Sequence, residues 1–259
     1  LNGSRLLDAL CQLAFGMKVH SGAGPEHEGI PSFEAQLTGS PLGAWPIVVL
    51  LGISVLAGSL RLCRERRSGA ILLGAVLGAA LCIRLAAGLW WQASLAEGDK
   101  FGFPDSEGYW ALAHTIVSGE PYQFGGPDAR VFRTPGYPVL LASLFWLLGD
   151  DPSVMWARAL NALLGAAAVG GVICLAWQLY DERTALLAGL MAALYPGAVA
   201  MSTFVLSEAP FCVLMLGQLI LWTDSHRAAG AARSFGGALL AGLVAGAATL
   251  VRPSWLLFT

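Results

Sequence analysis

The stretch that decides the fold is residues 69–93, GAILLGAVLGAALCIRLAAGLWWQA. It holds a single charged side chain, Arg84, in 25 residues. A helix needs about 20 apolar residues to cross the roughly 30 Å hydrocarbon core of a bilayer. Trp90 and Trp91 lie near its end, as aromatic side chains do at a membrane interface. The stretch therefore predicts a transmembrane helix.

The composition of the whole chain agrees with this prediction. Of the 259 residues, 56% are hydrophobic and 12% are charged, with a net charge of −2 and a mean hydropathy of +0.64. Soluble domains contain about 45–50% apolar and about 25% charged residues. Half the usual charge excludes a soluble globular enzyme, a disordered chain and a nucleic-acid-binding protein. We predict an all-α, polytopic integral membrane protein.

Further apolar runs predict the other helices. They lie at 42–60, 136–149, 153–180, 185–206, 209–222 and 235–251. The run at 136–149 is only about 21 Å long as a helix, which is too short to span. We expect an exposed N-terminal segment at 1–41 and a transmembrane domain at 42–259 with about six spans. Both ends of the chain look cut, so we expect a piece of a longer protein that is incomplete at its C-terminus.

The distribution of basic residues predicts which loops share a side. If 136–149 does not cross the membrane, the turns on the side of the basic cluster at 61–67 hold seven basic residues, whereas a crossing segment leaves four. The positive-inside rule favours the first arrangement. Residues 94–152 then form one external loop with eight acidic and three basic residues. In this topology Glu208 lies on the same, non-cytoplasmic side.

The external loop carries two carboxylates at an expected helix start. Pro104 favours a helix start, with Asp105 near the N-cap. Apolar positions 109, 112, 113 and 116 predict a short amphipathic helix lying on the membrane. Two interpretations stay open at this point. Asp105 and Glu107 could stabilise the helix start, or they could act on a substrate.

Arginines occur at the ends of several apolar runs. Arg133 directly precedes a Pro-rich turn, where it could anchor the chain at the interface or bind a phosphate with its planar guanidinium. Arg84 lies within an apolar run, where a charge costs about 2.5–3.5 kcal/mol unless it is paired or solvated. Arg252 ends the last run, and Glu208 begins another. By the predicted topology these residues map to one membrane face, which favours a functional site.

The chain carries an ordered series of short motifs. The series consists of Arg84, Asp105-x-x-x-Tyr109-x-x-x-Ala113, Arg133-x-Pro135-Gly136-Tyr137-Pro138, Gly149, Arg158, Asn161, Tyr195-Pro196, Ser207-Glu208 and Arg252-Pro253. Taken in order, these motifs resemble those of the bacterial GT-C membrane glycosyltransferases, the RgtA/B/C/D-like group that includes relatives of the protein O-mannosyltransferases and the lipid A aminoarabinose transferases. The resemblance covers about residues 70–259.

The resemblance implies a glycosyltransferase that moves a sugar from a polyprenyl-phosphate donor to a lipid, glycan or protein acceptor. The expected place is the non-cytoplasmic face of the bacterial plasma (inner) membrane, with the donor and membrane lipids as partners and no nucleic acid. A divalent cation held by Asp105 and Glu208 stays open. The implied site comprises Asp105, Glu208 and Glu107 as catalytic residues, Arg133, Arg84 and Arg252 as ligands of the donor phosphate, and Tyr109 and Tyr137 as substrate-binding residues.

The chain departs from the family pattern at one position. Many relatives carry a second acid directly after the first-loop aspartate, where this chain has Ser106 and then Glu107. The chemistry of the other residues fits the reaction. A carboxylate can accept the proton of an acceptor hydroxyl, and arginines can stabilise charge that develops on a leaving phosphate.

A non-enzymatic transporter or flippase for a lipid-linked or anionic solute is the alternative hypothesis. It would also use arginines within the membrane. A transporter predicts charges near the bilayer midplane and broken helices in two related halves. The glycosyltransferase predicts carboxylates gathered at one face.

Overall fold

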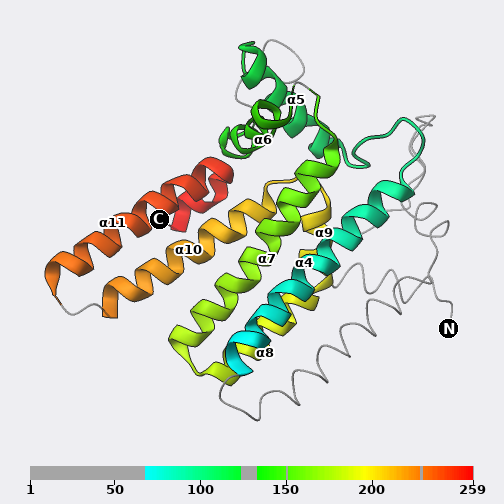
Figure 1. Cartoon of the computed structure of the whole chain (residues 1–259). Coiled ribbons are helices and arrows are strands. Elements are labelled where there is room, and N and C mark those ends of the chain that lie inside the picture. Colours follow the sequence, from blue (N-terminus) through cyan, green and yellow to red (C-terminus); the bar gives the residue numbers. More distant parts are fainter. Residues whose placement is uncertain (1–67, 124–132, 150, 228–229, 259) are drawn as a thin grey trace, which may run out of the picture. The chain divides into compact units, whose positions relative to one another are not determined.

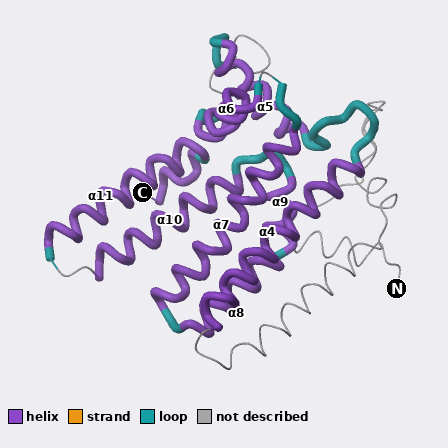
Figure 2. Tube along the Cα trace, viewed as in Figure 1, coloured by secondary structure: helices purple, strands orange, loops and turns teal. Residues whose placement is uncertain are grey.

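The computed structural model describes residues 68–123, 133–149, 151–227 and 230–258, and over these ranges the chain forms helices and no strands (Figures 1 and 2). The predicted all-α class is confirmed. The predicted segments at 1–41 and 42–60 lie outside the described residues. The helices are α4 (Ser68–Ser94), α5 (Pro104–Ser118), α6 (Gly136–Leu148), α7 (Val154–Leu179), α8 (Glu182–Leu194), α9 (Pro196–Thr203), α10 (Glu208–Arg227), α11 (Ala231–Val251) and the 3-10 helix η1 (Pro253–Phe258).

Three of the described helices are long and apolar enough to cross a membrane. They contain Ile71–Ser94, Val154–Leu179 and Ser234–Val251, which confirms the predicted spans at 69–93, 153–180 and 235–251. α6 has 13 residues and is too short, as expected. α10 extends beyond the predicted span at 209–222, but it is not among the helices that qualify by length and composition.

The predicted span at 185–206 was wrong as a continuous helix. It is divided into α8 and α9, which meet at an angle of 53° and could form a fourth, broken span or a re-entrant loop. The break follows from Pro196, which has no N–H to donate to the carbonyl of Ala192 four residues earlier. Arg84, which is 1% exposed, donates hydrogen bonds to the carbonyls of Ala192 (3.4 Å) and Ala193 (3.3 Å). The Arg84 side chain of α4 thus provides hydrogen-bond donors to carbonyls in the last turn of α8.

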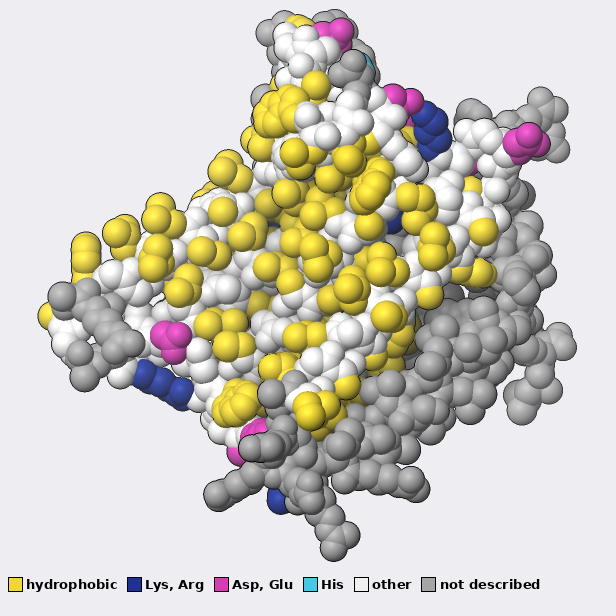
Figure 3. All heavy atoms as spheres, viewed as in Figure 1, with side chains coloured by type: hydrophobic (Ala, Val, Ile, Leu, Met, Phe, Trp, Pro, Cys, Tyr) yellow, Lys and Arg dark blue, Asp and Glu magenta, His cyan; other side chains and the backbone are white. Residues whose placement is uncertain are grey.

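α7 lies at the centre of the described helices. It packs against α4, α8 and α10, and α10 packs in turn against α11 (Figure 1). The short helices α5 and α6 pack on each other where α4 ends and where α7 and α10 begin. Hydrophobic side chains cover the visible sides of the long helices, and charged side chains gather toward their ends (Figure 3). This distribution suits a bundle whose sides face lipid.

The apolar face of α5 is buried within the protein. Tyr109 and Ala113 belong to a core cluster with Tyr137 and Phe145 of α6, and Ile116 packs against the same cluster. The predicted periodicity of α5 is therefore confirmed. The expectation that this face lies on the membrane was wrong, because α6 covers it.

A close contact of α7 gives a stability prediction. A Cβ at Gly165 would lie 2.4 Å from the Ser202 Oγ and 2.7 Å from the Arg84 Nε. Gly165→Ala is expected to lower the free energy of unfolding by about 1–3 kcal/mol, because the packed neighbours must shift. In the matched control Gly170→Ala the new Cβ meets only Leu77, at an ordinary 3.5 Å. Thermal unfolding in detergent checks this, and equal stability of the two variants would contradict the packing.

Candidate active site

Asp105 and Arg133 form an ion pair between the start of α5 and the segment that precedes α6. The Arg133 Nη2 lies 2.6 Å from the Asp105 Oδ1, and the guanidinium sits 4.5 Å above the ring of Tyr109. The prediction that Asp105 lies near the N-cap is wrong. Phe103 occupies that position and Pro104 follows it, so Asp105 lies within the first turn. Its carboxylate therefore faces an arginine rather than closing the helix end.

A second carboxylate–arginine pair joins the start of α10 to the residue that follows the end of α11. The Arg252 Nη1 donates a hydrogen bond of 2.8 Å to the Glu208 Oε1, and the Arg252 guanidinium lies 5.7 Å from the ring centre of Phe211. The other oxygen of Glu208, Oε2, is buried and has no hydrogen-bond partner among the described residues. A buried acceptor that is left unsatisfied costs about 1–3 kcal/mol.

Direct contacts join the two pairs. The hydroxyl of Tyr109, one turn after Asp105, shares a hydrogen bond of 3.2 Å with the Ser207 Oγ, next to Glu208. Thr134, next to Arg133, donates a hydrogen bond of 3.0 Å to the carbonyl of Val251, next to Arg252. The four charged residues of the two pairs thus lie at the same end of the helices, as the topology argument expected, although 147 positions separate Asp105 from Arg252.

The surroundings of Arg133 keep it charged and oriented. Burial lowers the pKa of its guanidinium, but the hydrogen bond to Asp105 and the nearby negative charge outweigh burial, so that the pKa is raised. Tyr122 donates a hydrogen bond of 2.9 Å to the backbone carbonyl of Arg133, and burial raises the pKa of the Tyr122 hydroxyl to about 12. The Arg133 side chain is 17% exposed and that of Asp105 is 54% exposed. The pair is therefore open to its surroundings mainly on the side of Asp105.

Three predicted site residues take no part in either ion pair. Glu107 is exposed on α5 and makes no hydrogen bond or ion pair with the described part of the chain. Arg84 is buried against the end of α8. Tyr137 is 0% exposed, and burial raises the pKa of its hydroxyl, which therefore stays protonated and donates to the Asn161 Oδ1 over 3.2 Å.

Two residues without a predicted role support the segments that lead into the site. Asn161 binds Tyr137 and the chain just before Glu208. Arg158 is 2% exposed and donates a hydrogen bond of 2.9 Å to the carbonyl of Lys100, in the loop that leads to α5. Their polar side chains within an apolar run were the available signal, since such residues usually face the interior of a bundle.

The carboxylates do not form a ready-made metal site. A divalent cation needs several oxygen, nitrogen or sulfur ligands, and no group of three or more His, Cys, Asp or Glu side chains gathers within the described ranges. Asp105 and Glu208 each already bind an arginine. These residues fit anion recognition better than cation binding.

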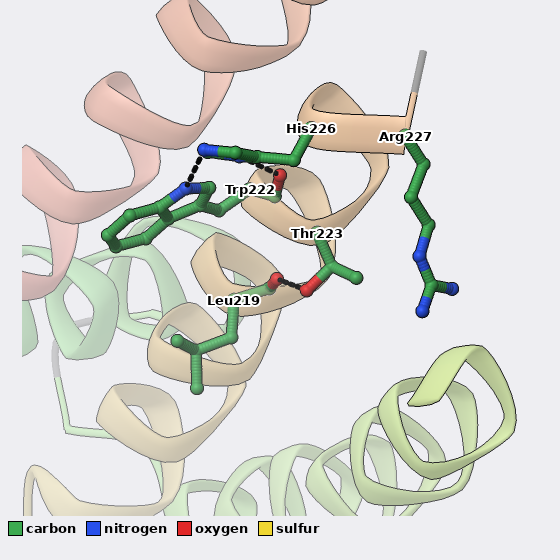
Figure 4. A pocket seen from close by; sticks show the side chains of 5 residues that line it. All are labelled: Leu219, Trp222, Thr223, His226 and Arg227. Carbon is green, nitrogen blue, oxygen red and sulfur yellow. Dashed lines mark hydrogen bonds between the residues drawn. The ribbon is translucent and has the colours of Figure 1, made fainter. Parts of the chain in front are cut away.

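A separate pocket lies on the second half of α10 (Figure 4). It has a volume of about 270 Å³. Trp222 donates a hydrogen bond of 3.1 Å to the His226 Nε2 at its edge. The pocket starts about three turns after Glu208, so it does not belong to the candidate site. Its lining residues are Leu219, Trp222, Thr223, His226 and Arg227.

Comparison with known proteins gives one family match. Residues 141–259 match the family model of the dolichyl-phosphate-mannose-protein mannosyltransferases. No curated protein and no solved structure matches. The matched part contains Glu208 and Arg252, whereas Asp105 and Arg133 precede it. Over residues 141–259 the chain is similar to a family of GT-C membrane glycosyltransferases, which confirms the resemblance that the sequence motifs indicated.

Proposed function

We propose that this protein is a membrane glycosyltransferase that moves a sugar from a polyprenyl-phosphate donor to the hydroxyl of an acceptor. The main observation is that two carboxylate–arginine pairs, Asp105–Arg133 and Glu208–Arg252, meet at one end of a set of apolar helices. The match over residues 141–259 to a mannosyltransferase family supports the same reaction. A lipid-linked donor explains why such a site would lie at a membrane boundary.

In the proposed reaction Arg133 binds the phosphate of the donor. The bond between the sugar carbon and the phosphate oxygen breaks, and the guanidinium stabilises the negative charge left on the lipid phosphate. Donor binding draws Arg133 away from the Asp105 carboxylate, to which it is bound in this structure. Asp105 then accepts the proton of the acceptor hydroxyl as its oxygen bonds to the sugar. The ion pair thus holds both groups ready until a donor arrives.

Glu208 and Arg252 have an accessory role in this proposal. The Glu208 carboxylate, whose side chain is 29% exposed, would accept a hydrogen bond from a hydroxyl of the sugar or of the acceptor. Arg252 is paired with the Glu208 carboxylate and can add a second positive charge near the donor phosphate. Tyr109 positions the Arg133 guanidinium through its ring.

The proposed site faces the non-cytoplasmic side. Single cysteines at Glu120, beyond α5, and at Glu182, at the start of α8, replace exposed side chains toward opposite ends of the helices. In intact cells a membrane-impermeant thiol reagent is expected to label the Glu120→Cys variant. The same reagent should label the Glu182→Cys variant only after permeabilisation. The positive-inside rule gives this direction. The reverse pattern would contradict a non-cytoplasmic site.

A transfer assay on the purified full-length protein tests the proposed function. A panel of polyprenyl-phosphate sugars is supplied with membrane lipid and glycan acceptors, and both the glycosylated product and the released polyprenyl phosphate are measured. The expected result is release of polyprenyl phosphate in step with product for at least one donor. Movement of intact donor across a vesicle membrane without release would favour the transporter instead.

The broken pair α8 and α9 is the observation that favours the transporter. Transporters bind solutes at the open ends of discontinuous helices. Here Arg84 already binds the last carbonyls of α8, at Ala192 and Ala193. The acidic residues Asp105 and Glu208 do not contact this break through any hydrogen bond between described residues. The enzyme therefore accounts for more of the charged residues.

A further inference from the structure

The segment at 204–207, between α9 and α10, leads directly into Glu208. It is not helical, yet Val205, Leu206 and Ser207 are each at most 5% exposed. A buried backbone outside a helix cannot use its own ladder of hydrogen bonds, so its carbonyls need partners from elsewhere. The position of Glu208 depends on what supplies these partners.

Asn161 of α7 supplies a hydrogen-bond donor to two of these carbonyls. Its Nδ2 lies 2.8 Å from the carbonyl oxygen of Phe204 and 3.4 Å from that of Leu206. Asn161 is 0% exposed, so its amide is out of reach of a substrate. The same Nδ2 lies 2.9 Å from the Tyr137 hydroxyl, which in turn donates to the Asn161 Oδ1. These contacts fix the amide while it holds the segment at 204–207.

The contacts continue to the other carboxylate. The ring of Tyr137 meets that of Tyr109 edge to face, with centres 5.1 Å apart. Tyr109 carries the Arg133 guanidinium above its ring and binds Ser207 through its hydroxyl. Asn161 thus lies at the base of a buried group of side chains that reaches both Asp105–Arg133 and Glu208.

We propose that Asn161 is a positioning residue that sets the place of Glu208 relative to the Asp105–Arg133 pair. This inference rests on the proposed function. Asn161 acts through the carbonyls of Phe204 and Leu206 and touches no reacting atom. A displacement of about 1 Å at a catalytic group can cost about 100-fold in rate. Loss of the amide donor should therefore reduce turnover without weakening donor binding at Arg133.

The test uses Asn161→Asp, which keeps the shape and the oxygen that accepts from Tyr137 but loses the N–H donors. In the full-length protein kcat is expected to fall about 10- to 100-fold, while the KM for the donor stays within about twofold. The matched control is Gln178→Ala, which removes another amide donor of α7, with a 3.0 Å bond to Asp224 of α10. The control should keep both parameters near the wild type. Equal effects of the two variants, or a loss confined to KM, would overturn the proposal.

A second readout does not depend on transfer. A cysteine in place of Val205, which is 1% exposed, should react with a thiol reagent slowly in the parent protein and several-fold faster in the Asn161→Asp background. The Gln178→Ala background should leave the rate unchanged. Equal labelling rates in the parent, Asn161→Asp and Gln178→Ala backgrounds would show that Asn161 does not hold the segment at 204–207. Faster labelling in Asn161→Asp together with a normal kcat would show that this segment does not position the site. Absence of transfer by the wild type would contradict the proposed function instead, and the labelling would still report on Asn161.

Discussion

Asp105→Asn in the full-length protein is expected to lower the rate of sugar transfer by about 10²–10⁴-fold, the usual contribution of a general base. Asparagine keeps an oxygen that can accept the N–H of Arg133, so the contact of 2.6 Å can survive in weaker form. What is lost is the ability to take a proton from the acceptor hydroxyl. The measurement is kcat of the purified protein at saturating donor.

The matched control for this substitution is Glu120→Gln. It converts an exposed acid just beyond the end of α5 to an amide. Turnover of this variant should stay within about twofold of the wild type, the range of a surface change away from a site. If Asp105→Asn also turns over normally, Asp105 has only a structural part, as an anchor for Arg133.

Arg133→Ala is expected to weaken donor binding by about 10- to 100-fold. Hydrogen bonds to charged groups contribute about 1.5–3 kcal/mol, and each 1.4 kcal/mol is tenfold in affinity. Arg133→Lys keeps the charge but not the planar fork, so it should weaken binding less than alanine does. The backbone carbonyl that Tyr122 binds is present in both variants.

The competing account makes Arg133 an anchor at the membrane interface. An anchor lost to alanine would lower insertion or stability and leave the donor affinity of the surviving protein unchanged. Donor affinity is therefore measured on correctly inserted, purified protein. Arg183→Ala, an exposed arginine at the start of α8, is the control and should bind the donor as the wild type does. Wild-type affinity in Arg133→Ala would rule out the phosphate role.

The sequence predicts a transmembrane helix correctly where the length of an apolar run decides the structure. Long, mainly apolar runs predict α4, α7 and α11, because crossing a bilayer requires about 20 such residues. The sequence does not predict the break between α8 and α9, although Tyr195-Pro196 lies at it. A proline within a long apolar run can kink or end a helix, and the outcome depends on a partner for the freed carbonyls. That partner, Arg84, comes from a helix more than 100 positions away.

The candidate site was readable in part. Asp105, Arg133, Glu208 and Arg252 were predicted as single residues on one face, but their pairing could not be derived, because opposite charges at one membrane boundary can combine in several ways. Arg84 was expected beside the donor phosphate because a charge in an apolar run suggests function. The carbonyls of α8 offer it another partner. The sequence does not indicate the partners of Asn161, because these are backbone carbonyls of a distant segment.

The central claim is that the two carboxylate–arginine pairs act as one active site for glycosyl transfer. A double-mutant cycle of Asp105→Asn and Glu208→Gln tests it most directly, with transfer rates of the full-length wild type, the two single variants and the double variant measured on one polyprenyl-phosphate sugar. Residues that act as a unit are strongly non-additive. We expect each single change to reduce transfer, and the double variant to be little slower than Asp105→Asn alone. Losses that multiply, or normal transfer by Glu208→Gln, would contradict a single site.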